Sequence, residues 1–149
     1  MILHAGLIAT RAGGRWRGVL LRGASGVGKS DLALRALQGG WRVAADDRVL
    51  AWRSGGRLFG RAPCAIRGLV EARGQAILRL APQAFAPIDL VADLVGAGAP
   101  LERLPDEARV EILGASLPRL ALRGVEASAL ARLALALQAN DSPAAKAPL

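Results

Sequence analysis

Residues 23–30 combine glycines, a lysine and a serine in a spacing that suits phosphate binding. They read Gly-Ala-Ser-Gly-Val-Gly-Lys-Ser and match the pattern G-x-x-x-x-G-K-[ST]. Glycines let successive backbone N–H groups point into one concavity, and Lys29 adds a positive charge for the β- and γ-phosphates of a nucleotide. Ser30 offers a hydroxyl to Mg²⁺. The predicted nucleotide-binding loop comprises Gly23, Ala24, Ser25, Gly26, Val27, Gly28, Lys29 and Ser30.

Two adjacent carboxylates, Asp46 and Asp47, follow an apolar segment shortly after this loop. A carboxylate at the end of a strand beside a phosphate loop can hold Mg²⁺ or one of its waters. Its neighbour can point elsewhere and accept a proton from an attacking hydroxyl. The alternative is a solvated turn, but the nearby nucleotide loop favours the chemical interpretation. Which of the two aspartates would be the base stays open at this stage.

These residues need strands and helices to hold them. We expect a β-hairpin from Ile2–Thr10 and Gly18–Arg22, a helix at Ser30–Gln38 and a strand at Trp41–Ala45. Further strands are expected at Arg48–Trp52, Arg57–Arg61, Ala76–Leu80, Ile88–Val95, Arg109–Leu113 and Leu117–Leu122, and a second helix at Val125–Gln138. Many strands with two helices predict an α/β or α+β domain built on a mixed β-sheet.

The length and composition favour one globular domain. The 149 residues are 52% hydrophobic, and no apolar run reaches the roughly 18 residues that a membrane span needs. We expect a catalytic domain at residues 1–138 and a disordered tail at 139–149, where prolines and small residues lack periodicity. The start of the chain does not resemble a signal peptide, and the single cysteine, Cys64, fits a reducing compartment. These features predict a cytoplasmic protein without membrane association.

The formal net charge of +8 raises the possibility of a nucleic-acid partner. Of the 20 basic residues, however, only Lys29 and Lys146 are lysines, and the arginines are scattered singly. This pattern favours a compositional bias toward arginine over a polyanion-binding surface. Aromatic residues for stacking on bases are also few. Nucleic-acid binding is therefore not expected, although a basic nucleic-acid-dependent ATPase stays as an alternative.

Three segments together resemble a known family. The loop at 23–30, the sequence Ala-Asp-Asp-Arg-Val at 45–49 and the sequence Leu-Val-Glu-Ala-Arg-Gly-Gln-Ala-Ile at 69–77 are similar to the catalytic domain of HPr kinase/phosphorylase. The resemblance implies a P-loop domain with a mixed sheet, of the type shared with phosphoenolpyruvate carboxykinase. It also implies ATP and Mg²⁺ as cofactors, and transfer of the γ-phosphoryl group to a serine of HPr or a related phosphocarrier. Its members can reverse the modification with inorganic phosphate.

The resemblance also implies roles for individual residues. Asp47 resembles the general base of the phosphorylation reaction, with Asp46 beside it, and His4 resembles a catalytic histidine on the strand before the loop. The full set of implied catalytic residues is His4, Lys29, Asp46, Asp47, Arg73 and Arg103, and the implied metal ligands are Ser30 and Glu71.

The sequence departs from the family pattern in two places. We expect it to begin at the catalytic domain, without the N-terminal domain of longer members. The basic loop that the family has before its last helix is reduced here to Leu122–Ser128, so we expect a kinase whose phosphorolytic reversal is weak or absent. A hexamer is implied by the resemblance alone. A non-enzymatic ATP-sensing module is a further alternative function.

Overall fold

A central six-stranded sheet organises the molecule, in the strand order β11-β12-β10-β3-β2-β4. The structure, a computed structural model, describes residues 1–64, 69–72, 76–79, 83–101 and 108–141, with the backbone alone for 69–72, 76–79 and 141. The sheet contains β2 (Gly6–Ala12), β3 (Arg15–Arg22), β4 (Arg42–Ala45), β10 (Leu90–Val95), β11 (Arg109–Ile112) and β12 (Ala115–Arg123). Because β10 runs parallel to both β3 and β12 and the other pairs are antiparallel, the sheet is mixed, as predicted.

The predicted hairpin is present as β2 and β3, which pair from Gly6 opposite Leu21 to Ala12 opposite Arg15. Gly13 and Gly14, both with positive φ, make the tight turn that the twist of such hairpins favours. The prediction of one strand over Ile2–Thr10 was wrong. The chain bends at His4 and Ala5, and β1 (Ile2–Leu3) pairs with another sheet.

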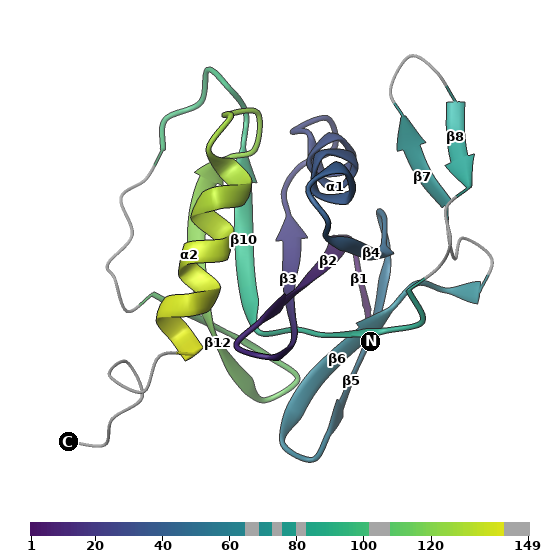
Figure 1. Cartoon of the computed structure of the whole chain (residues 1–149), viewed down its shortest axis with the longest axis vertical. Helices are drawn as coiled ribbons and strands as arrows, with labels where there is room; N and C mark the ends of the chain where they lie inside the picture. The colour runs from purple at the N-terminus through teal and green to yellow at the C-terminus, as the bar shows by residue number, and fades with distance from the viewer. Residues whose placement is uncertain (65–68, 73–75, 80–82, 102–107, 142–149) are drawn as a thin grey trace.

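Two helices cover one face of the central sheet (Figure 1). These are α1 (Lys29–Gln38) and α2 (Ala129–Asp141). Their buried residues pack against the side chains of β2, β3, β10 and β12 that point to this face. The helical residues of this core are Leu32, Ala33, Ala36, Ala129, Leu133 and Leu137. Both predicted helices therefore contribute apolar residues to the core.

A smaller four-stranded sheet, in the order β1-β5-β6-β9, packs against the opposite face. It consists of β1, β5 (Val49–Ser54), β6 (Arg57–Arg61) and β9 (Ala86–Pro87). Gly18 of β3 allows a close approach, because a Cβ atom at this position would lie 1.7 Å from the Pro87 carbonyl oxygen. Asp89 then accepts a hydrogen bond from the Gly18 N–H at 3.0 Å and pairs with the buried Arg17 guanidinium. These contacts join the two sheets into one core.

The remaining elements differ from the predictions mainly at their ends. The second helix begins at Ala129, four residues later than expected, and continues through Asp141. Residues 139–141 are therefore helical and do not belong to an irregular tail, whereas 142–149 lie outside the described residues. A separate pair is formed by β7 (Leu69–Ala72) and the predicted β8 (Ala76–Arg79). No helix in the described part of the chain is long and apolar enough to cross a membrane.

Candidate functional site

The segment between β3 and α1 forms a glycine-rich loop that opens at a helix N-terminus. Gly23, Gly26 and Gly28 all have positive φ, with Gly28 as the N-cap of α1 in the left-handed region. No side chain caps the helix, so its first N–H groups point toward the loop, where an anion is favoured by the helix dipole. A Cβ atom on Gly23 would lie 2.8 Å from the Leu94 carbonyl oxygen, and only glycine fits there.

Lys29 folds back over this loop. Its Nζ donates hydrogen bonds to the carbonyl oxygens of Gly23 and Ala24. The ammonium group therefore lies on the same side as the helix N-terminus and adds a full positive charge there. Ala24 also accepts a hydrogen bond from the Val27 N–H at 3.2 Å, which closes the turn within the loop. The predicted loop residues thus form one concave and electropositive backbone surface.

Ser30 and Asp46 meet at the base of the loop. The Ser30 hydroxyl donates to Asp46 Oδ1 at 2.8 Å, and Asp46 is only 8% exposed. Asp46 comes directly after β4, and the register with β2 shifts between Leu7 and Ile8, where the bulged β4 strand turns toward the site. Bulges of this kind redirect side chains beside active sites. The structure therefore brings together a hydroxyl and a carboxylate that the sequence separates by an entire helix.

Two oxygen ligands of this kind fit Mg²⁺, which is usually bound by one or two carboxylates together with substrate phosphates. Among the described residues, no three His, Cys, Asp or Glu side chains gather into a metal site by themselves. A magnesium ion here would accordingly depend on phosphate oxygens to complete its ligands. Glu71, the other predicted ligand, lies on β7 opposite Ile77, and β7 packs beside α1.

Asp47 adopts an unusual backbone conformation. Its φ is +72°, and the Arg48 N–H donates to the Asp46 carbonyl at 2.9 Å, so Asp47 is the central residue of a γ-turn. Non-glycine residues with positive φ are strained and cluster at functional sites. The Asp47 side chain is exposed. The two neighbouring carboxylates therefore have different surroundings, one buried against Ser30 and the other open to solvent.

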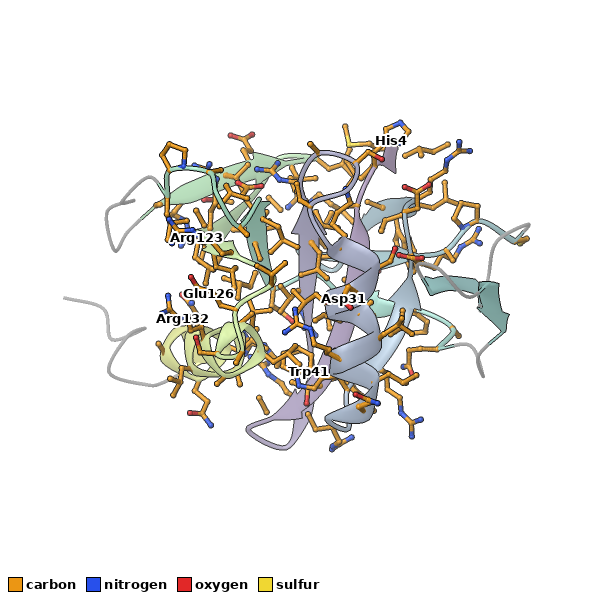
Figure 2. All side chains as sticks on the ribbon, turned by 90° about the horizontal axis from the view of Figure 1, so that it is seen from above. His4, Asp31, Trp41, Arg123, Glu126 and Arg132 are labelled. Atoms are coloured by element: carbon orange, nitrogen blue, oxygen red, sulfur yellow. The ribbon has the colours of Figure 1, made fainter. Side chains whose placement is uncertain are left out.

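A backbone hydrogen bond joins the bend that contains His4 to this turn. The Ala5 N–H donates to the Asp47 carbonyl at 3.0 Å, which holds the bend after β1 against the turn after β4. His4 is exposed, and it lies in the bend before β2 and not on a strand as expected. Since Gly6 pairs with Leu21, the start of β2 is level with the end of β3 and the loop. In Figure 2, His4 lies at the upper edge of the molecule, whereas Trp41, which follows α1, lies in its lower half.

A charged cluster lies at the end of β3, directly before the loop. Arg22, the last residue of β3, donates to both oxygens of Asp93 at 2.8 and 3.0 Å, and Arg119 of β12 contacts the same carboxylate. Burial raises the pKa of the Asp93 carboxyl, but the hydrogen bonds and charges of the two arginines outweigh it and hold the pKa below its ordinary value of 3.8. The sequence analysis missed this cluster, because its residues are brought together only by strand register.

The loop before α2 also lies near the start of α1. Arg35 of α1 donates to the carbonyl oxygens of Gly124 and Glu126, and Val125 lies near Gly28. The labelled side chains of Arg123, Glu126 and Arg132 gather at one side in Figure 2, and Glu126 pairs with both arginines at 3.5 and 3.8 Å. The arginines of this segment are thus engaged within the chain. Arg73 and Arg103, two predicted catalytic residues, lie outside the described residues.

The loop, the Ser30–Asp46 contact, Asp47 and His4 therefore occupy one edge of the central sheet, where β3 and β4 end and β2 begins. Ligands of open α/β sheets bind outside the carboxyl ends of the strands. Preorganised N–H groups and cations at this edge suit phosphoryl transfer, whose catalysis depends mainly on positioning and charge stabilisation. An exposed carboxylate nearby could accept a proton from an attacking hydroxyl.

Comparisons with known proteins agree with this chemistry. A family model described as the HPr serine kinase C-terminal domain matches residues 15–134. An HPr kinase/phosphorylase from an Exiguobacterium species is 35% identical over 116 residues, which cover 70% of this chain and 37% of that protein. A second HPr kinase/phosphorylase, from Brevibacillus brevis, is 45% identical over 64 residues, covering 42% of this chain and 21% of that protein. The chain thus spans well under half the length of these curated relatives.

A solved structure, that of the Hpr(Ser) kinase/phosphatase from Coxiella burnetii, is similar over most of the chain. The TM-score is 0.74 at 20% sequence identity, and the similarity covers 95% of this chain and 96% of that one. At this identity the similarity concerns the fold. It confirms the predicted P-loop domain with a mixed sheet of the HPr kinase catalytic type.

Proposed function

The chain belongs to the family of HPr serine kinase C-terminal domains, and from this we propose that it transfers the γ-phosphoryl group of ATP to a serine of HPr or of a related phosphocarrier. The observation that carries the proposal is the common edge of the sheet at which the glycine-rich loop, the Ser30–Asp46 contact and the strained Asp47 meet. Each part corresponds to one requirement of phosphoryl transfer to a hydroxyl: phosphate binding, metal binding and proton acceptance.

The loop would bind the phosphates of ATP through its backbone N–H groups and the uncapped start of α1. Lys29 would move from the carbonyl oxygens of Gly23 and Ala24 to the β- and γ-phosphates, where its charge offsets the charge that develops during transfer. Such preorganised donors act most strongly when solvent is excluded by bound substrate. This role requires a lysine at position 29, and Lys29 is one of only two lysines in the chain.

Ser30 and Asp46 would hold Mg²⁺, with Glu71 as a further candidate ligand from β7. Bound Mg²⁺ neutralises charge on the phosphate oxygens. The burial of Asp46 and its 2.8 Å hydrogen bond with Ser30 support this role over that of a base, because its carboxylate already faces the loop. We therefore assign Asp46 to metal binding. The sequence had left open which of the two aspartates is the general base, and this assignment favours Asp47.

Asp47 would then be the general base that accepts the proton of the seryl hydroxyl as that oxygen attacks phosphorus. Its exposed side chain is accessible to a protein substrate, and its turn separates it from Asp46. His4, fixed beside the same turn by the Ala5–Asp47 hydrogen bond, would contribute to substrate positioning at this edge. Arg73 and Arg103 stay candidates for stabilising the transferred phosphoryl group.

The kinase direction is favoured over phosphorolysis. The segment 122–128, which would correspond to the family's basic loop, keeps only one basic residue, Arg123, and that guanidinium binds Ala99 and Glu126. It is therefore not free to bind an incoming phosphate. The reaction would take place in the cytoplasm. A hexameric assembly is the corresponding proposal for the quaternary state.

The test is phosphotransfer from labelled ATP to the phosphocarrier from the same organism, with Mg²⁺ and with or without inorganic phosphate. We expect labelled carrier without phosphate present, little release of label when phosphate is added, and no labelling by Lys29→Ala. ATP binding without labelling of any carrier would favour an ATP-sensing module instead. ATP hydrolysis that requires RNA or DNA would favour the nucleic-acid-dependent ATPase.

A further inference from the structure

The small sheet carries a partly exposed aromatic cluster on its outer side. Trp52 of β5 pairs across the strands with Phe59 of β6, and their ring centroids lie 6.0 Å apart. Phe85, just before β9, packs against both rings at 6.2 and 6.1 Å and is 50% exposed. The whole chain contains only five aromatic residues. Three of them therefore gather at one surface that is outside the core.

Aliphatic residues extend this surface along the sheet. Leu50 lies opposite both Ile2 of β1 and Arg61 of β6, and Ile2 is 58% exposed. The alternate residues of β5 and β6, including Val49 and Leu58, are buried against the central sheet. We call the outer surface formed by Ile2, Leu50, Trp52, Phe59 and Phe85, with Arg57 and Arg61 at its edge, the aromatic face. Contiguous exposed apolar patches commonly mark interaction sites.

The charged side chains of these strands are basic. Strands β1, β5, β6 and β9 contain no acidic residue, and two of their three arginines, Arg57 and Arg61, border the aromatic face. The Arg57 guanidinium lies over the Phe59 ring, 5.4 Å from its centroid, and is 3.4 Å from Asp89. Arg61 donates to the Ala62 carbonyl at 3.4 Å, which keeps its charged group beside the strand end. Aromatic and arginine side chains are the residues most enriched at the centres of protein interfaces.

The charge and the ring packing of the aromatic face favour one class of binding partner. In a two-fold dimer the face would meet its own copy, so that arginines would oppose arginines between two chains that each carry +8. Single-stranded nucleic acid requires separate rings on which successive bases can stack. Here the three rings pack on one another, and Arg57 already covers one face of Phe59. An acidic protein with apolar side chains complements both the charge and the rings.

We propose that the aromatic face is a docking surface for an acidic protein segment that carries apolar side chains. Trp52 and Phe59 lie near the tip of the β5–β6 hairpin, which is at the opposite end of the molecule from the β3–α1 loop in Figure 1, whereas Ile2 and Leu50 extend the face toward the bend at His4. Binding there leaves the ATP loop accessible. The rings supply the apolar anchor, and Arg57 and Arg61 supply attraction for carboxylates at the edge.

The test uses a short fluorescein-labelled peptide in which Glu or Asp alternates with Leu or Phe, and fluorescence anisotropy as the readout. We expect binding that weakens with added salt and that falls about tenfold in Phe85→Ala, a typical loss for an interface anchor. Arg57→Gln should weaken binding as well, which keeps the test valid if one variant folds poorly. Leu135→Ala is the matched control, because Leu135 is an apolar residue on α2 that is even more exposed than Phe85, at 65% against 50%. Phosphotransfer should be unchanged in all three variants.

Three control probes decide between occupants. The same peptide with serine in place of its apolar residues, and the same peptide with lysine in place of its acidic residues, should both bind far more weakly. Equal binding of either one, or equal binding of the acidic peptide to wild type and Phe85→Ala, overturns the proposal. Tighter binding of oligothymidine, or self-association in sedimentation that Phe85→Ala abolishes, would identify nucleic acid or a second copy as the occupant and also overturn it.

Discussion

The backbone conformation of Asp47 predicts that Asp47→Gly raises the stability of the fold and lowers its activity. Asp47 has a φ of +72° within its γ-turn. A left-handed conformation costs an L-residue roughly 1–2 kcal/mol, and glycine avoids this cost. Glycine in turn loses about 0.5–1 kcal/mol more conformational entropy on folding. Asp47→Gly should therefore stabilise the fold by about 0.5–1 kcal/mol, which raises the Tm by about 1–4 °C for a chain of this size.

The same substitution should abolish phosphotransfer, because it removes the proposed base. Asp47→Asn keeps the size of the side chain and its tolerance of positive φ, so its stability should stay within about 0.5 kcal/mol of wild type. Its kcat for carrier phosphorylation should nevertheless fall roughly 100-fold or more, the usual contribution of a general base. Thermal denaturation and a steady-state phosphotransfer assay on the same preparations measure both effects.

Leu113 provides the matched control. It is the other described non-glycine residue with positive φ, at +50°, and it lies in the β11–β12 turn away from the loop edge. Leu113→Gly should also raise the Tm, by the same backbone argument, but should leave kcat unchanged. A lower Tm for Asp47→Gly, with a raised Tm for Leu113→Gly, would refute the strain argument. Wild-type kcat in Asp47→Asn would refute the assignment of the base.

Three further predictions concern the loop and its support. Gly23→Ala should reduce ATP affinity at least about tenfold in calorimetry. Its Cβ atom would lie 2.8 Å from the Leu94 carbonyl oxygen, a contact that costs roughly 1–3 kcal/mol to relieve. Gly98→Ala is the control and should bind ATP normally, because the space around Gly98 is open. Ser30→Ala should weaken ATP binding about tenfold with Mg²⁺ present and little in EDTA, and equal losses in both conditions would contradict metal binding by Ser30. Asp93→Asn should lower the free energy of unfolding in urea by about 1–2 kcal/mol at neutral pH. Because the folded-state pKa of Asp93 is lowered, this stabilisation is present above the unfolded pKa and is lost as the pH falls through the folded value. The difference from wild type should therefore shrink below about pH 4, and a constant difference would exclude the carboxylate charge as its source.

Local sequence signals predicted the parts of the site that local geometry determines. The spacing of Gly23, Gly28 and Lys29 predicted a loop before a helix, and the structure places that loop between β3 and α1. The expected hairpin is present as β2 and β3, with its turn at Gly13 and Gly14. The mixed sheet and the two helices also followed from periodicity. These features depend on conformational preferences of a few consecutive residues, so one sequence suffices to identify them.

The features that were missed depend on pairing between distant strands. Nothing near Ile2 indicates that it pairs with Leu50, so the break at His4 was not predicted. The Arg22–Asp93 contact requires the parallel register of β3 and β10. The positive φ of Asp47 follows from the turn that returns the chain from the central sheet to the small one. In each case the feature is determined by contacts between distant segments and not by the local conformational preferences of the residues.

The most direct measurement of the central claim is the site of modification on the phosphocarrier. After incubation with ATP, Mg²⁺ and this chain, tandem mass spectrometry of the carrier should find one phosphoryl group on a serine, absent with Lys29→Ala and strongly reduced with Asp47→Asn. A carrier that stays unmodified, or that is modified on a residue other than serine, would contradict the proposed serine kinase activity.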